Sequence, residues 1–211
     1  MTSRVSAAPR RLGRPKDVAS AETHQRLLSE ARRAFARDGF DAATNREIAE
    51  AAGITAGAIY HYYPSKLELY VAVYKQVQHL VYDAFDAAVA AHVTLVDQFC
   101  AVLDAAVAQN RRDPSIAGFV VGVAAAAERH PELVQRLANA RSVSTRFVHR
   151  LIDDADRRGE LAPDVSAQAV EDLINAVLGG LARFGSQTGD AARHESAVGV
   201  LKRCMTGSLL R

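Results

Sequence analysis

The chain of 211 residues lacks most features of secreted, membrane and metal-binding proteins. Its 2 cysteines, Cys100 and Cys204, are too few and too far apart for a metal cluster or a disulfide framework. No window approaches about 18 consecutive apolar residues, and the N-terminus has no apolar region typical of a secretory signal. We therefore expect a soluble, cytoplasmic protein with no metal site and no membrane partner.

The motifs of several enzyme classes are also absent. The sequence has no H-E-x-x-H, no P-loop, no G-x-S-x-G, and no G-x-G-x-x-G that follows a strand. No stretch alternates polar and apolar residues for long, and no internal repeat is visible. These absences favour an all-α protein that has no catalytic residues and needs no cofactor.

The most informative segment is residues 44–68, TNREIAEAAGITAGAIYHYYPSKLE. Thr44 and Glu47 have the spacing of a capping box, which predicts a helix from about residue 45. Gly53 is the residue type that most readily takes the left-handed conformation after a helix, and Thr55 can cap a second helix. Two short helices around such a turn form a helix-turn-helix, a DNA-binding motif.

Packing positions separate this motif from an ordinary helix pair with a glycine corner. Apolar, small or turn-forming residues stand wherever the motif needs them: Ile48, Ala49, Ala52, Gly53, Ile54, Ile59 and Tyr62. The outward face of the second helix begins with small residues, which let its backbone approach base edges. Its N-terminal end also offers free N–H groups and a partial positive charge to a phosphate.

Residues 20–70 resemble the DNA-binding domain of the tetracycline-repressor (TetR) family. The matching sequence segments are REIAEAAGITAGAIYHYYPSKLEL and, before it, FARDGFDAAT. The resemblance implies an all-helical homodimer with a three-helix N-terminal domain that binds palindromic double-stranded DNA operators. It also implies a larger C-terminal helical domain that binds a small-molecule effector and dimerises. Beyond residue 70 the family shares no motif, so the resemblance does not identify the effector.

The resemblance also implies roles for individual residues. Phosphate contacts are expected from Thr44, Tyr60, His61 and Lys66. Base-reading positions are expected at Arg46, Thr55, Ala56 and Gly57.

Charge is divided along the chain in a way that fits this interpretation. Residues 1–66 hold 11 basic and 7 acidic side chains, net +4, and residues 67–211 hold 15 and 17, net −2. We predict a flexible basic arm at residues 1–19, a DNA-binding domain at 20–66, and an effector-binding and dimerisation domain at 67–211. The arm either follows DNA phosphates and enters a minor groove, or is a solvated tail. The basic residues of the arm all lie within residues 1–16, which contain no acidic residue: Arg4, Arg10, Arg11, Arg14 and Lys16.

Caps and breakers predict the remaining helices. A helix over residues 23–37 ends at Gly39, and Ser65 with Glu68 forms a second capping box. Asp113 is predicted to cap a helix whose first residue is Pro114. The helices expected beyond residue 64 cover residues 66–82, 95–110, 114–129, 131–158, 167–184 and 191–209.

The last two predicted helices carry apolar faces that suit a dimer interface. The residues at helical spacing are Ala169, Leu173, Ala176, Val177, Gly180, Leu181, Phe184, Ala197, Val198, Leu201 and Met205. These faces either seal the core of one protomer or pair two protomers, and they could do both. The resemblance favours an intermolecular four-helix bundle.

We expect the effector pocket between the helices of residues 95–184, because small-molecule sites are mostly apolar with a few polar groups. Candidate walls are Phe99, Phe119, Val123, Phe147 and Leu178, and candidate polar contacts are His149 and Asn175. Each could instead be ordinary core or surface. The functional hypothesis is a repressor released from its operator by a small apolar or aromatic effector. The alternative is an architectural DNA-binding protein or an activator without an effector.

Overall fold

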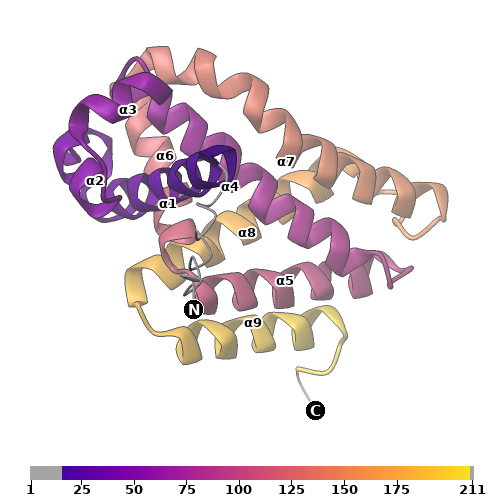
Figure 1. Cartoon of the computed structure of the whole chain (residues 1–211). Helices are drawn as coiled ribbons and strands as arrows, with labels where there is room; N and C mark the ends of the chain where they lie inside the picture. The colour runs from indigo at the N-terminus through magenta and orange to yellow at the C-terminus, as the bar shows by residue number, and fades with distance from the viewer. Residues whose placement is uncertain (1–15, 210–211) are drawn as a thin grey trace, which may run out of the picture.

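The computed structural model describes residues 16–209, and within them the chain is helical and contains no strand (Figure 1). The helices are α1 (Lys16–Ala42), α2 (Asn45–Ala51), α3 (Ala56–Tyr62), α4 (Lys66–Val89), α5 (Leu95–Arg112), α6 (Ser115–Arg129), α7 (Pro131–Arg157), α8 (Ala167–Thr188) and α9 (Ala191–Met205). The prediction of an all-α protein is confirmed.

Side-chain caps start the helices where the sequence predicts them. Thr44 and Glu47 form the capping box of α2 in both directions. Thr55 and Thr94 accept hydrogen bonds from backbone N–H groups in the first turns of α3 and α5. Ser65 accepts the N–H of Glu68, but the predicted return bond is replaced, because the Glu68 carboxylate pairs with Arg136 of α7.

Several predicted boundaries are wrong. α1 begins at Lys16, so residues 16–19 are helical and not part of a flexible arm, whereas residues 1–15 lie outside the described residues. The predicted break at Gly39 is confirmed, because its φ of +79° and ψ of 175° are non-helical and the backbone kinks there between two helical stretches of α1. α4 continues to Val89, because its last turns still bury Phe85. α6 begins one residue late, and α9 ends at Met205.

Two buried clusters hold the helices together. The first, here the head cluster, joins α1, α2, α3 and α4 to α6 and α7 and includes Leu27, Phe35, Ile48, Ile59, Tyr70, Phe119 and Leu137. The second, here the body cluster, joins α4, α5, α7, α8 and α9 and includes Phe85, Phe99, Leu103, Phe147, Ile152, Ile174 and Val198. Burying an apolar side chain of this size stabilises the fold by about 1.5–3 kcal/mol. α4 contributes to both clusters.

The arrangement separates two ends of the molecule. α2 and α3 lie at one end, and α9 runs along the opposite edge beside α5 (Figure 1). Tyr70 of α4 packs between Phe35 of α1 and Phe119 of α6, with ring centroids 4.9 Å apart on each side. The head cluster therefore crosses the predicted boundary at residue 66, and α1 packs directly on α4 and α6 of the larger part of the chain.

Candidate DNA-binding surface and ligand cavity

The turn between α2 and α3 has the backbone geometry that the motif requires. Gly53 has φ +66°, a conformation that L side chains rarely adopt. The N–H of Ile54 donates to the carbonyl of Ala49 at 2.9 Å, and Ile59 and Ala49 are buried beneath the pair. This packing fixes α3 relative to α2.

Side chains from α1 anchor the pair in ways that sequence reasoning missed. Arg26 Nε donates to the carbonyl of Ala52 at 2.7 Å, which satisfies an end group of α2. A ring nitrogen of His24 lies 2.6 Å from the hydroxyl of Tyr63, just after α3. Neither contact has a local sequence signal, because the partners are separated by 26 and 39 residues.

The predicted DNA-contacting residues share one exposed surface. Arg46 of α2 is exposed, and within residues 16–209 it forms no ion pair, so its charge is available to DNA. Thr55, Ala56, Gly57 and His61 are exposed on α3, and Tyr60 is 57% exposed. These residues are accessible on α2 and α3, and their individual contacts with DNA stay predictions.

Two of the predicted phosphate contacts also have structural partners. The Thr44 hydroxyl donates to Glu47 Oε2 at 2.8 Å. Lys66 Nζ donates to the carbonyls of Asp41 and Ala43 at 3.0 and 3.1 Å and lies 4.8 Å from the ring centroid of Phe40. An ammonium has three donors, so Lys66 retains one for a phosphate.

An ion pair with a buried arginine fixes the N-terminal end of α6 to α1. The helices α1, α2 and α3 are here called the head. Arg32 of α1 is 4% exposed, and its guanidinium lies 2.5 Å from Asp113 and donates to Ser115 Oγ at 3.0 Å. Burial alone would raise the pKa of Asp113, but hydrogen bonds from Ser115 and the charge of Arg32 outweigh it and hold that pKa below its ordinary value.

The other end of α6 is fixed to Asp41, in the segment before α2. Arg129 Nε donates to Asp41 Oδ2 at 2.9 Å, and His130 Nε2 lies 2.5 Å from Asp41 Oδ1. The hydrogen bond from His130 is the main reason that the pKa of Asp41 lies below its ordinary value. Between these ends, Gly118 faces Ala36 of α1, so closely that a Cβ at Gly118 would lie 3.3 Å from the Cβ of Ala36.

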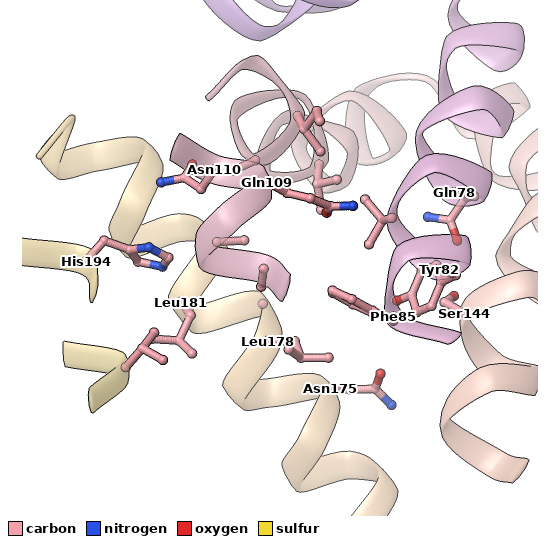
Figure 2. Close-up of a pocket in the computed structure, with 18 residues that line it drawn as sticks. Gln78, Tyr82, Phe85, Gln109, Asn110, Ser144, Asn175, Leu178, Leu181 and His194 are labelled. Atoms are coloured by element: carbon pink, nitrogen blue, oxygen red, sulfur yellow. The ribbon is translucent and has the colours of Figure 1, made fainter. Parts of the chain in front are cut away.

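The other side of α6 borders a cavity of about 290 Å³ among helices α4 to α9, here called the body (Figure 2). Its walls come from six helices: Gln78, Val81, Tyr82 and Phe85 (α4), Ala106, Gln109 and Asn110 (α5), Ile116, Ala117 and Val120 (α6), Ser144 (α7), Asn175, Leu178, Gly179, Leu181 and Ala182 (α8), and His194 and Val198 (α9). A largely apolar hollow with a few polar groups is the usual form of a small-molecule site.

Comparisons with known proteins agree with the helix-turn-helix. Residues 27–73 match the family model described as bacterial regulatory proteins, tetR family. The HTH-type transcriptional regulator UidR of Escherichia coli (strain K12) is 29% identical over 189 residues, which cover 89% of this chain and 93% of UidR. The chain belongs to the TetR family of bacterial transcriptional regulators.

Two further relatives support this membership along the whole chain. The HTH-type transcriptional repressor BepR of Brucella suis biovar 1 (strain 1330) is 29% identical over 167 residues, covering 76% of this chain and 79% of BepR. The solved structure of Salmonella enterica GusR has a TM-score of 0.71 at 28% identity and covers 95% of this chain and 99% of GusR. TetR-family proteins are DNA-binding regulators and not enzymes. They bind small-molecule effectors and usually dimerise.

The cavity of this TetR-family chain uses few of the residues that the sequence suggested. Asn175 and Leu178 line it. Phe119 and Val123 are instead buried in the head cluster, and Phe99 and Phe147 in the body cluster. His149 is exposed and pairs with Glu171 at 2.8 Å, and this hydrogen bond is the main cause of its raised pKa. Sequence reasoning missed Gln78, Asn110 and His194.

The faces predicted for dimerisation divide into two sets. Val177, Leu181, Val198, Leu201 and Met205 pack in the body cluster. Ala169, Leu173, Ala176 and Gly180 remain exposed on α8, with the Leu173 side chain at 61%. On α9, Val200, two residues after Val198, is 50% exposed. The exposed set leaves an apolar surface on the last two helices, and dimerisation through it stays a prediction.

Among the described residues, no group of three or more His, Cys, Asp or Glu side chains could hold a metal ion. Within the same part of the chain, every helix is too short or too polar to span a lipid bilayer. Cys100 and Cys204 are free thiols.

Proposed function

We propose that this regulator is a repressor that binds a palindromic double-stranded DNA operator as a homodimer and is released when a small molecule occupies the cavity. The observation that carries the proposal is the position of α6. One side of α6 borders the cavity through Ile116, Ala117 and Val120, and its two ends are fixed to the head by Asp113 and Arg129. A ligand that shifts α6 would therefore shift the contacts of the head.

The DNA-binding surface supports two roles for its residues: contacts with phosphates that position the protein on DNA, and contacts with bases that recognise the sequence. Tyr60, His61 and Lys66 lie at the C-terminal side of α3 or just beyond it, where their donors would meet phosphates. Residues 55–57 lie at the exposed N-terminal end of α3, where small side chains allow approach to base edges, and Arg46 is exposed near the start of α2. Phosphate contacts position a protein on DNA, whereas base contacts specify the sequence.

Dimerisation follows from the geometry of a palindromic site. Two recognition helices must lie about 34 Å apart, or a multiple of it, to meet successive major-groove faces. The exposed apolar surface of α8, which lies outside the helix-turn-helix, offers a base for two such heads. We assign DNA binding to residues 20–66 and effector binding and dimerisation to residues 67–211.

The repressor assignment is supported by BepR, which is described as a transcriptional repressor. Repression with release also suits the α6 arrangement, because the helix that borders the cavity is the one fixed to the head by the ion pairs of Asp113 and Arg129. An activator or an architectural protein without an effector would not require a cavity that borders the helix fixed to the head.

Selection of bound duplexes from a random DNA library tests the DNA end of the proposal. We expect the wild-type protein to select a palindromic site. The Arg46→Ala variant should select bases less strictly at the positions that Arg46 contacts, with a loss of about 1–3 kcal/mol of discrimination at each. A Tyr60→Phe variant is the control, because it should weaken all sequences similarly. Recovery of sites without two-fold symmetry would contradict dimeric operator binding.

A reporter gene placed behind the selected site separates the remaining alternatives. A repressor lowers expression of the reporter, and an activator raises it. An architectural protein would bind without a change in expression that small molecules reverse.

A further inference from the structure

Three side chains on the cavity wall have buried polar atoms without hydrogen-bond partners. Among the described residues five such atoms occur, and three of them, Gln78 Oε1, Asn110 Oδ1 and His194 Nε2, belong to residues that line this one cavity. Gln78 is 7% exposed and His194 is 4% exposed. A buried polar atom without a partner destabilises a protein, and such atoms are few in native structures. Their concentration at one cavity points to a ligand that supplies the partners.

The cavity wall has no permanently charged side chain. Within residues 16–209, the lining residues include no Asp, Glu, Lys or Arg. The phenol of Tyr82 is neutral, since burial raises its pKa to about 12. An ion placed among these side chains would lose its hydration without gaining a counter-ion.

The helix ends at the cavity do not provide a site for an anion either. α6 and α9 both begin beside the cavity, through Ile116 and His194. Each N-terminus already has a carboxylate as its partner: Asp113 Oδ1 accepts the N–H of Ser115 at 3.1 Å, and Asp190 Oδ1 accepts the N–H of Arg193 at 3.0 Å. These carboxylates offset the partial positive charge that would otherwise attract an anionic ligand.

The polar groups lie at two sides of the cavity with apolar wall between them. Figure 2 shows Asn110 and His194 on one side and Gln78, Tyr82 and Ser144 on the other, with Leu178 between. Ser144 Oγ donates to the carbonyl of Arg141 at 2.8 Å, so this hydroxyl is already partnered. Gln78, Asn110 and His194 are the lining residues whose buried polar atoms have no partner within the protein.

We infer that the cavity binds an uncharged small molecule with an apolar middle and a hydrogen-bonding group at each end. At one end a donor meets Gln78 Oε1. At the other end a donor meets Asn110 Oδ1, and a second group pairs with His194 Nε2, which accepts or donates according to its tautomer. The inference rests on the proposed function in that this molecule is the effector, and it excludes carboxylates, phosphates and ammonium compounds from that role.

Matched probes test the charge requirement directly. The probes are primary amides, carboxylates and amines that share one four-carbon chain attached to a phenyl, naphthyl or octyl group. Their binding to the full chain is measured by calorimetry. We expect the amide to bind at least about tenfold more tightly than the carboxylate or amine of the same skeleton. A hydroxyl added at the end of the best amide away from the amide group should tighten binding further. A carboxylate or amine that binds as tightly as its amide, or no binding by any amide at millimolar concentration, would overturn the inference.

Variants of the unpartnered groups locate the binding. Gln78→Leu and Asn110→Leu should each weaken the best amide roughly tenfold, because each removes one hydrogen bond to the ligand. Gln98→Leu is the matched control, since Gln98 Oε1 is also buried without a partner but does not line the cavity. Unchanged affinity in both cavity variants would overturn the inference, and Asn110→Leu decides the test if Gln78→Leu does not fold.

The ligand-free variants give a second readout. Gln78→Leu should raise the melting temperature by a few degrees, because it removes a buried acceptor that has no partner in the empty protein. A lower melting temperature would mean that this oxygen stabilises the fold and is not reserved for a ligand.

The inference and the proposed function can fail separately. If a carboxylate releases the operator while the amides do not bind, the ligand class is wrong and the regulatory function stands. If the amides bind through Gln78 and Asn110 but leave operator affinity unchanged, the ligand class is right and the proposed function is wrong.

Discussion

Lys66 connects the DNA-binding surface to its structural support. Two of its three donors bond to the carbonyls of Asp41 and Ala43, where the chain leaves α1, and the third is free to meet a phosphate. The same side chain therefore shapes the surface and contributes to its charge.

Replacing Lys66 with Met should reduce the slope of log affinity against log salt concentration by about one, because one phosphate contact is lost. Binding to all DNA sequences should weaken together. Lys75→Met on the same helix is the control, since Lys75 is exposed on α4 beyond the DNA-binding surface. If the slope of the Lys66 variant equals that of the wild type, Lys66 is structural and makes no phosphate contact.

Helix α6 is the element that links the cavity to the head. It packs along α1 through Gly118 and Ala36, and its ends are held by Arg32 and Asp41. Both ends are held by ion pairs, so a small displacement of α6 strains contacts at two separate places in the head.

Gly118→Val should weaken operator binding about tenfold without any ligand, within the range typical of allosteric coupling. The added side chain would push α6 away from α1, where the space for even a Cβ is tight. Gly122→Val, one turn further along α6, is the matched control because a Cβ there meets nothing within 4 Å. Equal operator affinity for the two variants, measured by fluorescence anisotropy, would remove α6 from the coupling path.

The Arg32–Asp113 pair should make stability depend on pH in the acid range. The pKa of Asp113 is lowered in the folded protein, so the pair stabilises the fold above the unfolded-state pKa, and this stabilisation is lost as the pH falls through the folded-state pKa. Asp113→Asn should therefore cost roughly 2–3 kcal/mol near pH 6, and the difference from the wild type should shrink below about pH 4.

Urea unfolding of both proteins across that pH range measures the difference. Asp41 and Glu160 also have lowered pKa values, but they titrate in both proteins, so their effect cancels. A difference that stays constant down to about pH 3 would show that the Asp113 charge does not stabilise the fold.

The helix-turn-helix was predictable from the sequence because its determinants are local. Thr44, Gly53 and Thr55 act within a few residues of their own positions, and the structure confirms their caps and turn. The end of α4 and the start of α1 were not predictable in this way, because they depend on which distant helices cover Phe85 and Leu27.

The cavity was the least predictable feature. Aromatic residues such as Phe99 and Phe147 fit the expected composition of a pocket, but they fill the body cluster, since large apolar side chains are the ones that cores bury. A signal for Gln78 was present: it lies four residues from both Tyr74 and Tyr82, on the apolar face of α4. A polar residue on such a face can mark either a buried network or a binding site.

At the scale of the whole molecule, the exposed surface of α8 determines whether two heads can bind one operator. Leu173, Ala176 and Gly180 are exposed in the single protomer. Covering this surface in a second copy would remove apolar area from water, which is the usual driving force for permanent homodimers.

Gly180→Arg should convert the dimer to a monomer in light scattering and abolish tight operator binding. In one protomer a Cβ at Gly180 meets nothing within 4 Å, and the position is exposed, so the fold should be unaffected, whereas an unpaired charge in a dimer interface costs several kcal/mol. Ala87→Arg, an exposed position on α4, is the control. A Gly180→Arg protein that stays dimeric would place the interface elsewhere.

The central claim is that occupation of the cavity and binding of the operator oppose each other. The most direct test is a calorimetric titration of the best cavity ligand into the protein alone and into the protein saturated with its selected operator. By linkage, the operator must weaken the ligand by the same factor that the ligand weakens the operator, typically about 5- to 150-fold. We predict a loss of ligand affinity in that range in the operator complex. Equal affinity in the two titrations would contradict the account, because the ligand would then have no control over DNA binding.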